Sequence, residues 1–166
     1  MPAGRRLDTM AAKARRVVKP AAAYLIRDLM ADSVLRGTAA AGAIDGHETW
    51  AKTGTSSDAR DAWFAGGAGS VVAVVWVGLD DNRPLGVSGA RAAAPIWKAF
   101  MEQAVPRRAP WAGARPSGVV EHWIQTETGL LVARERDDAE LEIFRTGALP
   151  PKRRLLKKDV PVPIVE

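Results

Sequence analysis

The sequence predicts an α+β chain: a three-stranded antiparallel meander with flanking helices, followed by a small C-terminal β-rich appendage. Three observations support this prediction. Apolar residues at helical spacing occur both before and after a central stretch of short extended runs. Only a few turn-forming residues separate those runs, which favours antiparallel pairing of neighbours. Further extended runs then follow a segment that contains several Pro and Gly residues.

The first helix is predicted over residues 20–37. Pro20 suits a first helical turn, and Gly37 suits the position just past a helix end. Between them, apolar residues at helical spacing predict a face directed at the core. These residues are Ile26, Leu29, Met30 and Val34. The small residues of 38–46 then predict a loop.

Three short extended runs predict the meander, at 50–55, 61–65 and 71–79. The connecting residues 56–58 and 66–69 have the composition of turns. The run at 71–79 is apolar at consecutive positions, so we expect it to be a central strand that is covered on both faces.

The second helix is predicted over residues 92–105, with Pro95 near its start and Pro106 just past its end. Its expected apolar face consists of Ile96, Trp97, Phe100, Met101 and Val105. Trp97 and two further tryptophans in apolar runs, Trp63 and Trp76, are expected in the core.

The remaining chain predicts the appendage. Residues 119–125 and 130–133 are interpreted as a hairpin, with a further strand at 140–144. The chain is thus predicted to consist of four parts: a basic lead-in at 1–19, the main unit at 20–106, the β-rich appendage at 107–149 and a basic Pro-rich tail at 150–166.

Composition excludes several kinds of site. The chain has 166 residues and no cysteine, so a disulfide framework, a thiolate nucleophile and a Cys-bound metal are excluded. His47 and His122 stand far apart in the sequence and do not suggest a metal site. We therefore expect no metal and no cofactor.

The net charge of +5 is concentrated at the two ends of the chain, and the segment between them is mildly acidic. Basic ends of this kind are more often solvated arms than readers of base sequence, so no nucleic-acid partner is expected. A basic module that binds anionic lipid or nucleic acid stays open as an alternative. No apolar run is long enough for a membrane span, and no signal peptide is predicted.

One motif on the first predicted strand carries chemistry, Lys52-Thr53-Gly54-Thr55. It offers a cation, two hydroxyls and a residue without Cβ where another group can approach the backbone. On an edge strand, unpaired N–H groups would add hydrogen-bond donors. Together these groups suit a carboxylate, or the oxyanion that develops during acyl transfer.

Around this motif, A-K-T-G-T-S-S-D-A-R-D-A-W-F-A-G at 51–66 resembles the class A, bifunctional penicillin-binding proteins. The resemblance continues through V-V-W-V-G-L-D-D at 74–81 and A-A-A-P-I-W-K-A-F at 92–100, and covers roughly residues 17–150. It implies a partial serine-transpeptidase/β-lactamase-like fold and the C-terminal part of a transpeptidase domain. It also implies peptidoglycan cross-linking and a location on the periplasmic side of the cell membrane.

The resemblance implies a role for each residue of the motif. Lys52 would border the active site, and the Thr53 and Thr55 hydroxyls would hold the carboxylate of a D-Ala-D-Ala stem peptide or a β-lactam. The Thr55 N–H would be an oxyanion donor, and Gly54 would keep the strand wall clear of side-chain bulk. Lys52 and Thr55 are thus the catalytic candidates, and Thr53, Gly54 and Thr55 bind substrate.

The sequence departs from the family pattern at two motifs. No Ser is followed by Lys at the third position, and the only Asn, Asn82, lacks a Ser two positions earlier. We therefore expect the chain to be inactive alone, and whether it is itself an enzyme stays open. It is interpreted either as a degenerate fragment or as a non-catalytic subunit that complements a separately encoded N-terminal half. Self-association is a further expectation, because half a sheet leaves an unpaired edge.

Overall fold

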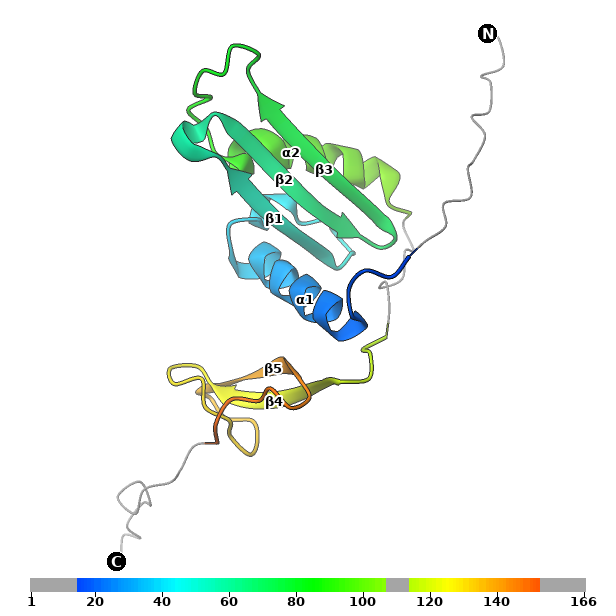
Figure 1. Ribbon diagram of the computed structural model, residues 1–166, viewed down its shortest axis with the longest axis vertical. Helices are drawn as coiled ribbons and strands as arrows, with labels where there is room; N and C mark the ends of the chain where they lie inside the picture. Colours follow the sequence, from blue (N-terminus) through cyan, green and yellow to red (C-terminus); the bar gives the residue numbers. More distant parts are fainter. Residues whose placement is uncertain (1–14, 107–113, 153–166) are drawn as a thin grey trace, which may run out of the picture.

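The computed structural model describes residues 15–106 and 114–152, and Figure 1 shows their arrangement. Most of the predicted lead-in at 1–19 and tail at 150–166, and the start of the appendage at 107–113, lie outside the described residues. A three-stranded sheet with two long helices forms the larger part, and a separate two-stranded sheet follows it in the chain.

The larger sheet is a meander of β1 (Thr49–Thr55), β2 (Asp61–Ala68) and β3 (Val71–Gly78), in the order β1-β2-β3. Both pairings are antiparallel, with Lys52 opposite Ala65 and Trp63 opposite Trp76. The predicted α+β meander with flanking helices is confirmed.

Helix α2 (Gly89–Ala104) covers one face of this sheet and encloses the core (Figure 1). Phe64 from β2 meets Trp97 from α2 with ring centroids 5.1 Å apart, and Met101 is also fully buried. The Trp97 indole N–H donates to the Ala73 carbonyl at 2.9 Å, which satisfies the buried polar group.

The predicted limits and apolar face of this helix need correction. It begins at Gly89 rather than Ala92, and Pro95 lies inside it. Ile96 and Phe100 are about half exposed, while Trp97 is buried. The helix presents only one narrow stripe to the sheet, so two of the five apolar positions fall outside the packed surface.

The prediction that 71–79 is a central strand covered on both faces is wrong. In the sheet that the described residues form, β3 is an edge strand and β2 is the central one. Alternate residues of β3 face α2, and the intervening ones, Val72, Val74 and Trp76, are exposed. Trp63 is 44% exposed and Trp76 50%, so neither lies in the core as predicted. A run of consecutive apolar residues therefore does not show whether both faces of the strand are covered by other elements.

The connection between β2 and β3 is also shorter than expected. Residues 66–68 belong to β2, and Gly69, with a φ of 55°, makes the tight turn. A Cβ on Gly67 would lie 2.5 Å from the Trp50 indole, so glycine is needed here because Trp50 lies across it.

Helix α1 (Pro20–Arg36) runs alongside β1, as Figure 1 shows. Its buried residues are Ala31 and Val34. The predicted core-facing stripe is therefore wrong in part, since Ile26 and Leu29 are exposed. Ala31 and Val34, three positions apart, lie on one side of the helix, and this is the side that is buried.

The smaller sheet pairs β4 (Val119–Gln125) with β5 (Ala139–Arg145). The predicted hairpin of 119–125 with 130–133 forms only in part: an antiparallel bridge joins Ile124 to Leu131, and the Gln125 and Val132 N–H groups donate to the Leu130 and Trp123 carbonyls. The continuous antiparallel register instead runs from Val119 opposite Arg145 to Gln125 opposite Ala139. Full pairing over seven residues supplies more hydrogen bonds than a short run could.

Candidate functional site

The Lys-Thr-Gly-Thr motif lies on β1, which has a strand neighbour on one side only within the described parts of the chain. Backbone groups in an antiparallel pair point alternately toward the partner and away from it. Ser56 N–H donates to the Asp61 carbonyl at 3.0 Å, which sets that alternation. The N–H and C=O groups of Thr53 and Thr55 therefore point to the open edge, as expected for an edge-strand donor site.

Lys52 lies at this edge. Its side chain is exposed, and Nζ donates to the Thr53 carbonyl at 2.8 Å, with the Thr53 hydroxyl 3.5 Å away. The ammonium is thus brought to the side of the strand toward which the Thr53 backbone points. This places positive charge beside an open row of backbone donors.

The two threonine hydroxyls face the other way from the Lys52 side chain, since side chains alternate along a strand. Thr53 Oγ1 lies 3.1 Å from Thr38 Oγ1, which follows α1. Thr55 Oγ1 accepts a hydrogen bond from the Gly89 N–H at 3.2 Å. Both hydroxyls are therefore held in position by neighbouring elements, one at each end of the motif.

Gly89 also packs closely against the motif. A Cβ built on it would lie 2.5 Å from the Gly54 carbonyl oxygen and 2.3 Å from that of Trp63. The first residue of α2 therefore touches the strand backbone in the middle of Lys-Thr-Gly-Thr. A Cβ on Gly54 would lie 3.1 Å from the Trp63 Cβ, so a side chain at this position would be in close contact with Trp63.

Thr38 and Gly89 are site residues that the sequence reasoning did not identify. The only local signal for Gly89 is its place after Ser88, a residue type that often precedes a helix. Thr38 stands among small loop residues and gives no signal of a contact with Thr53. Both contacts join segments far apart in the sequence.

The exposed face of the sheet adjoins the motif. Lys52 and Gly54 share this face with Trp63, Val74 and Trp76, as the strand registers require. The Trp63 and Trp76 rings lie 6.2 Å apart, and the Trp76 indole N–H donates to Asp61 at 2.8 Å. The apolar surface therefore reaches the motif without interruption.

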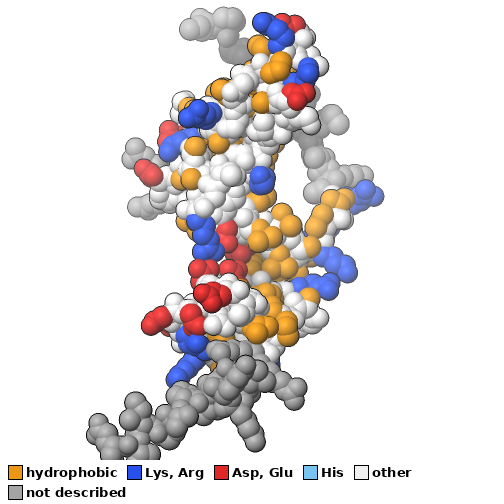
Figure 2. All heavy atoms as spheres, turned by 90° about the vertical axis from the view of Figure 1, so that its left-hand side faces the viewer, with side chains coloured by type: hydrophobic (Ala, Val, Ile, Leu, Met, Phe, Trp, Pro, Cys, Tyr) orange, Lys and Arg blue, Asp and Glu red, His pale blue; other side chains and the backbone are white. Residues whose placement is uncertain are grey.

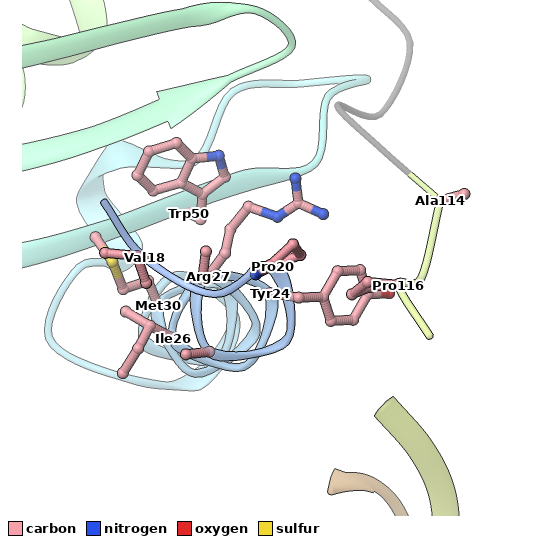
Figure 3. Close-up of a pocket in the computed structure, with 11 residues that line it drawn as sticks. Val18, Pro20, Tyr24, Ile26, Arg27, Met30, Trp50, Ala114 and Pro116 are labelled. Carbon is pink, nitrogen blue, oxygen red and sulfur yellow. The ribbon is translucent and has the colours of Figure 1, made fainter. Parts of the chain in front are cut away.

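Apart from the motif, a recess lies at the start of β1, between α1 and the segment leading to β4. Its volume is about 590 Å³, and Figure 3 shows Trp50 and Met30 on one side and Tyr24 beside Pro116 on the other. Arg27 reaches toward Trp50, with its guanidinium 5.3 Å from the Tyr24 ring centroid. The lining is otherwise apolar.

The chemistry that the described residues offer is that of cations, hydroxyls and amides. Within 15–106 and 114–152, no three His, Asp or Glu side chains are placed to hold a metal ion. In the same residues, no helix has the length and apolar character needed to cross a membrane. The motif at the edge of β1 offers an ammonium, two hydroxyls and backbone N–H groups, which are the donors expected of an anion site.

Comparison with known proteins agrees with this geometry. Penicillin-binding protein 1A of Pseudomonas aeruginosa is 33% identical over 141 residues, which cover 83% of this chain and 17% of that protein. The Clostridium tetani protein of the same name is 34% identical over 144 residues, covering 81% of this chain and 18% of the relative. No family model matches the sequence.

The fold is also similar to a solved one. The crystal structure of penicillin-binding protein 1A from Haemophilus influenzae matches with a TM-score of 0.74 and 30% identity over 86% of this chain and 22% of that one. The chain thus spans about a fifth of the length of the relatives that it matches. It is a homologue of class A penicillin-binding protein 1A and corresponds to part of the transpeptidase domain.

Proposed function

We propose that the chain provides one wall of a serine D,D-transpeptidase active site and so takes part in peptidoglycan cross-linking on the periplasmic side of the cell membrane. The observation that carries this proposal is Lys52-Thr53-Gly54-Thr55 on an open sheet edge, in a homologue of penicillin-binding protein 1A. In the proposed organisation, residues 20–106 belong to the transpeptidase unit and residues 107–149 form an appended one.

The substrate would be a stem peptide that ends in D-Ala-D-Ala, or a β-lactam that resembles it. The terminal carboxylate would lie against Lys52 and the Thr53 and Thr55 hydroxyls. These groups suit an anion because the Lys52 ammonium lies 3.5 Å from the Thr53 hydroxyl at the open edge, and the Thr55 hydroxyl follows two residues further along the same strand.

The serine, its lysine and the S-x-N motif would come from a segment outside these 166 residues. The serine Oγ attacks the penultimate D-Ala carbonyl, and the carbonyl oxygen becomes an oxyanion that accepts a hydrogen bond from the Thr55 N–H. The C–N bond then breaks and D-Ala leaves with a proton. An amine of a neighbouring stem peptide attacks the ester and releases the serine.

That segment is proposed to cover the exposed apolar face beside Lys52. The face is continuous with the motif, so a segment that packs on Trp63 and Val74 would place its own side chains near Lys52. Burial of this surface would supply the association energy, at about 25 cal/mol per Å² of apolar area.

A chimera tests the proposal. Residues 15–152 replace the corresponding segment of the Pseudomonas aeruginosa relative, which supplies the missing motifs, and labelling by a fluorescent penicillin is followed over time. We expect a labelled chimera and, for Lys52→Ala, acylation slower by about 100-fold, the scale of losing one group that stabilises developing charge.

The matched control is Lys98→Ala, which removes an exposed lysine from α2, away from the motif. It is expected to label at the rate of the parent chimera. Circular dichroism and melting temperature separate loss of folding from loss of chemistry. A folded Lys52→Ala chimera that labels as fast as its parent contradicts the proposal.

A further inference from the structure

Helix α1 packs against strand β5 of the smaller sheet, and this contact is predominantly acidic. Figure 2 shows the acidic side chains gathered, with basic ones beside them, where the sheet of β4 and β5, called the hairpin from here on, meets the rest of the molecule. The carboxylates come from both elements: Asp28 and Asp32 from α1, and Glu140 and Glu142 from β5.

Among the described residues, one cation joins the two elements. Arg36, in the last turn of α1, pairs with Asp32 of its own helix at 2.9 Å. The same guanidinium reaches Glu140 at 3.3 Å and Glu142 at 3.7 Å, both across the contact. A single arginine therefore neutralises carboxylates from both sides, and the contact retains excess negative charge.

The other charged and titratable groups around this contact are few. Arg27 of α1 acts electrostatically on Asp28 and Glu48, and His47 lines the same recess as Asp28, Asp32 and Glu48. From the hairpin side, His122 of β4 lies directly opposite Glu142 in the strand register. The charge balance of the contact is set by these groups together.

The carboxylates respond to their crowding and burial. Burial raises the pKa of Asp28, and nearby Asp32 raises it further, against the lowering effects of Arg27 and Arg36. Burial also raises the pKa of Glu142, with Asp32 and Asp28 acting in the same direction. Because the Glu142 pKa is raised partly by Asp32 and Asp28 across the contact, the attached arrangement binds a proton on Glu142 more tightly than a detached one would, so lower pH favours attachment.

We propose that the contact between α1 and β5 is a pH-sensitive latch, in which Arg36 holds the hairpin on the helix and carboxylate repulsion loosens it as the solution becomes less acidic. Arg36 of the latch is only two residues away in sequence from Thr38, which contacts strand β1. Arg36 is followed by Gly37 and then by Thr38, whose hydroxyl contacts Thr53 at 3.1 Å. Attachment of the hairpin would therefore bear on the end of α1 that supports the motif.

The chain has no cysteine, so a spin-label pair can be placed without removing native thiols. Leu29→Cys on α1 and Thr146→Cys just after β5 are both exposed and outside the ion pairs. The distance distribution between the labels is measured in the full chain at pH 5 and pH 7.5. We expect the ratio of detached to attached hairpin to rise by about threefold at the higher pH. A change of this size corresponds to one or two weak interactions between surface charges.

Two variants give the proposal opposite tests. Arg36→Gln should raise the detached fraction at both pH values, and Asp28→Asn with Glu142→Gln should keep the hairpin attached at both. Glu102→Gln, a carboxylate on α2 away from the contact, should behave as the parent. A parent chain without pH response, or a double variant that keeps the full response, overturns the latch.

Discussion

Gly89 illustrates how one residue supports the motif without belonging to it. It is buried at the first turn of α2, its N–H donates to Thr55 Oγ1, and it has no room for a Cβ. Alanine in a helix is ordinarily favoured over glycine by up to about 1 kcal/mol. Here the close backbone oxygens of Gly54 and Trp63 reverse that preference, because strand and helix would have to move apart.

We therefore expect Gly89→Ala to lower the free energy of unfolding by about 1–3 kcal/mol, the usual cost of overpacking. Urea unfolding followed by circular dichroism measures the change. Arg91→Ala, at an exposed position in the same turn, should change it by less than about 0.5 kcal/mol. A Gly89→Ala chain as stable as the parent would show that the contact is loose.

At the same scale, the sequence could predict Lys52, Thr53, Gly54 and Thr55 as a group because they are adjacent and form a strand. Thr38 and Gly89 could not be predicted, because their contacts depend on α1 and α2 packing beside β1. The donor groups that one strand offers can be predicted from its residue types. The supports of a strand come from distant segments, which periodicity does not identify.

Strand β3 has the features of an adhesive edge. Val71–Gly78 contains no charged residue and no proline, although these are the usual means of protecting an edge. One face of the strand, with Val72, Val74 and Trp76, is exposed. The strand therefore offers both unpaired backbone groups and apolar area to any second chain.

We expect the isolated chain to self-associate in a concentration-dependent way. Val74→Lys should reduce this association about tenfold or more, because association would bury the added charge, which is costly to desolvate. Sedimentation velocity over a range of concentrations gives the measurement. Leu149→Lys places the same charge at an exposed leucine outside the sheet and should have little effect. Equal effects of the two variants would assign the association to general charge instead.

At the scale of helices and strands, local sequence patterns predicted where each element occurs better than which neighbours it has. Both helices and all three meander strands occur close to where the sequence placed them. The errors concern partners: β3 is an edge rather than a centre among the described strands, and the main partner of 119–125 is 139–145, with 130–133 paired only next to the turn. An apolar pattern reports which residues share a face, whereas the choice of neighbour is made by competition among segments.

At the scale of the whole molecule, residues 1–166 lack the serine and lysine pair that the penicillin-acylation reaction would need, and this gives a prediction. None of their serines has a lysine three positions later. We expect the purified 166-residue polypeptide to form no covalent adduct with a fluorescent penicillin, because the acylation step needs an activated hydroxyl.

A denaturing gel scanned for fluorescence tests this expectation, with the intact Pseudomonas aeruginosa relative as the labelled control. A fluorescent band at 17.8 kDa that survives denaturation would contradict it and would require a nucleophile among the residues present. Labelling of a second, co-purified polypeptide only when this chain is present would instead support complementation.

The sequence by itself determined the α+β class, the meander and the strand that carries Lys-Thr-Gly-Thr, because all three depend on residues that are neighbours in the chain. Only the tertiary structure decided which faces are buried, which strand is the edge, and that Thr38 and Gly89 hold the motif. It also brought Arg36 to the hairpin across more than a hundred residues of chain. These features are long-range: each results from packing one segment against another, and neither segment encodes the contact alone.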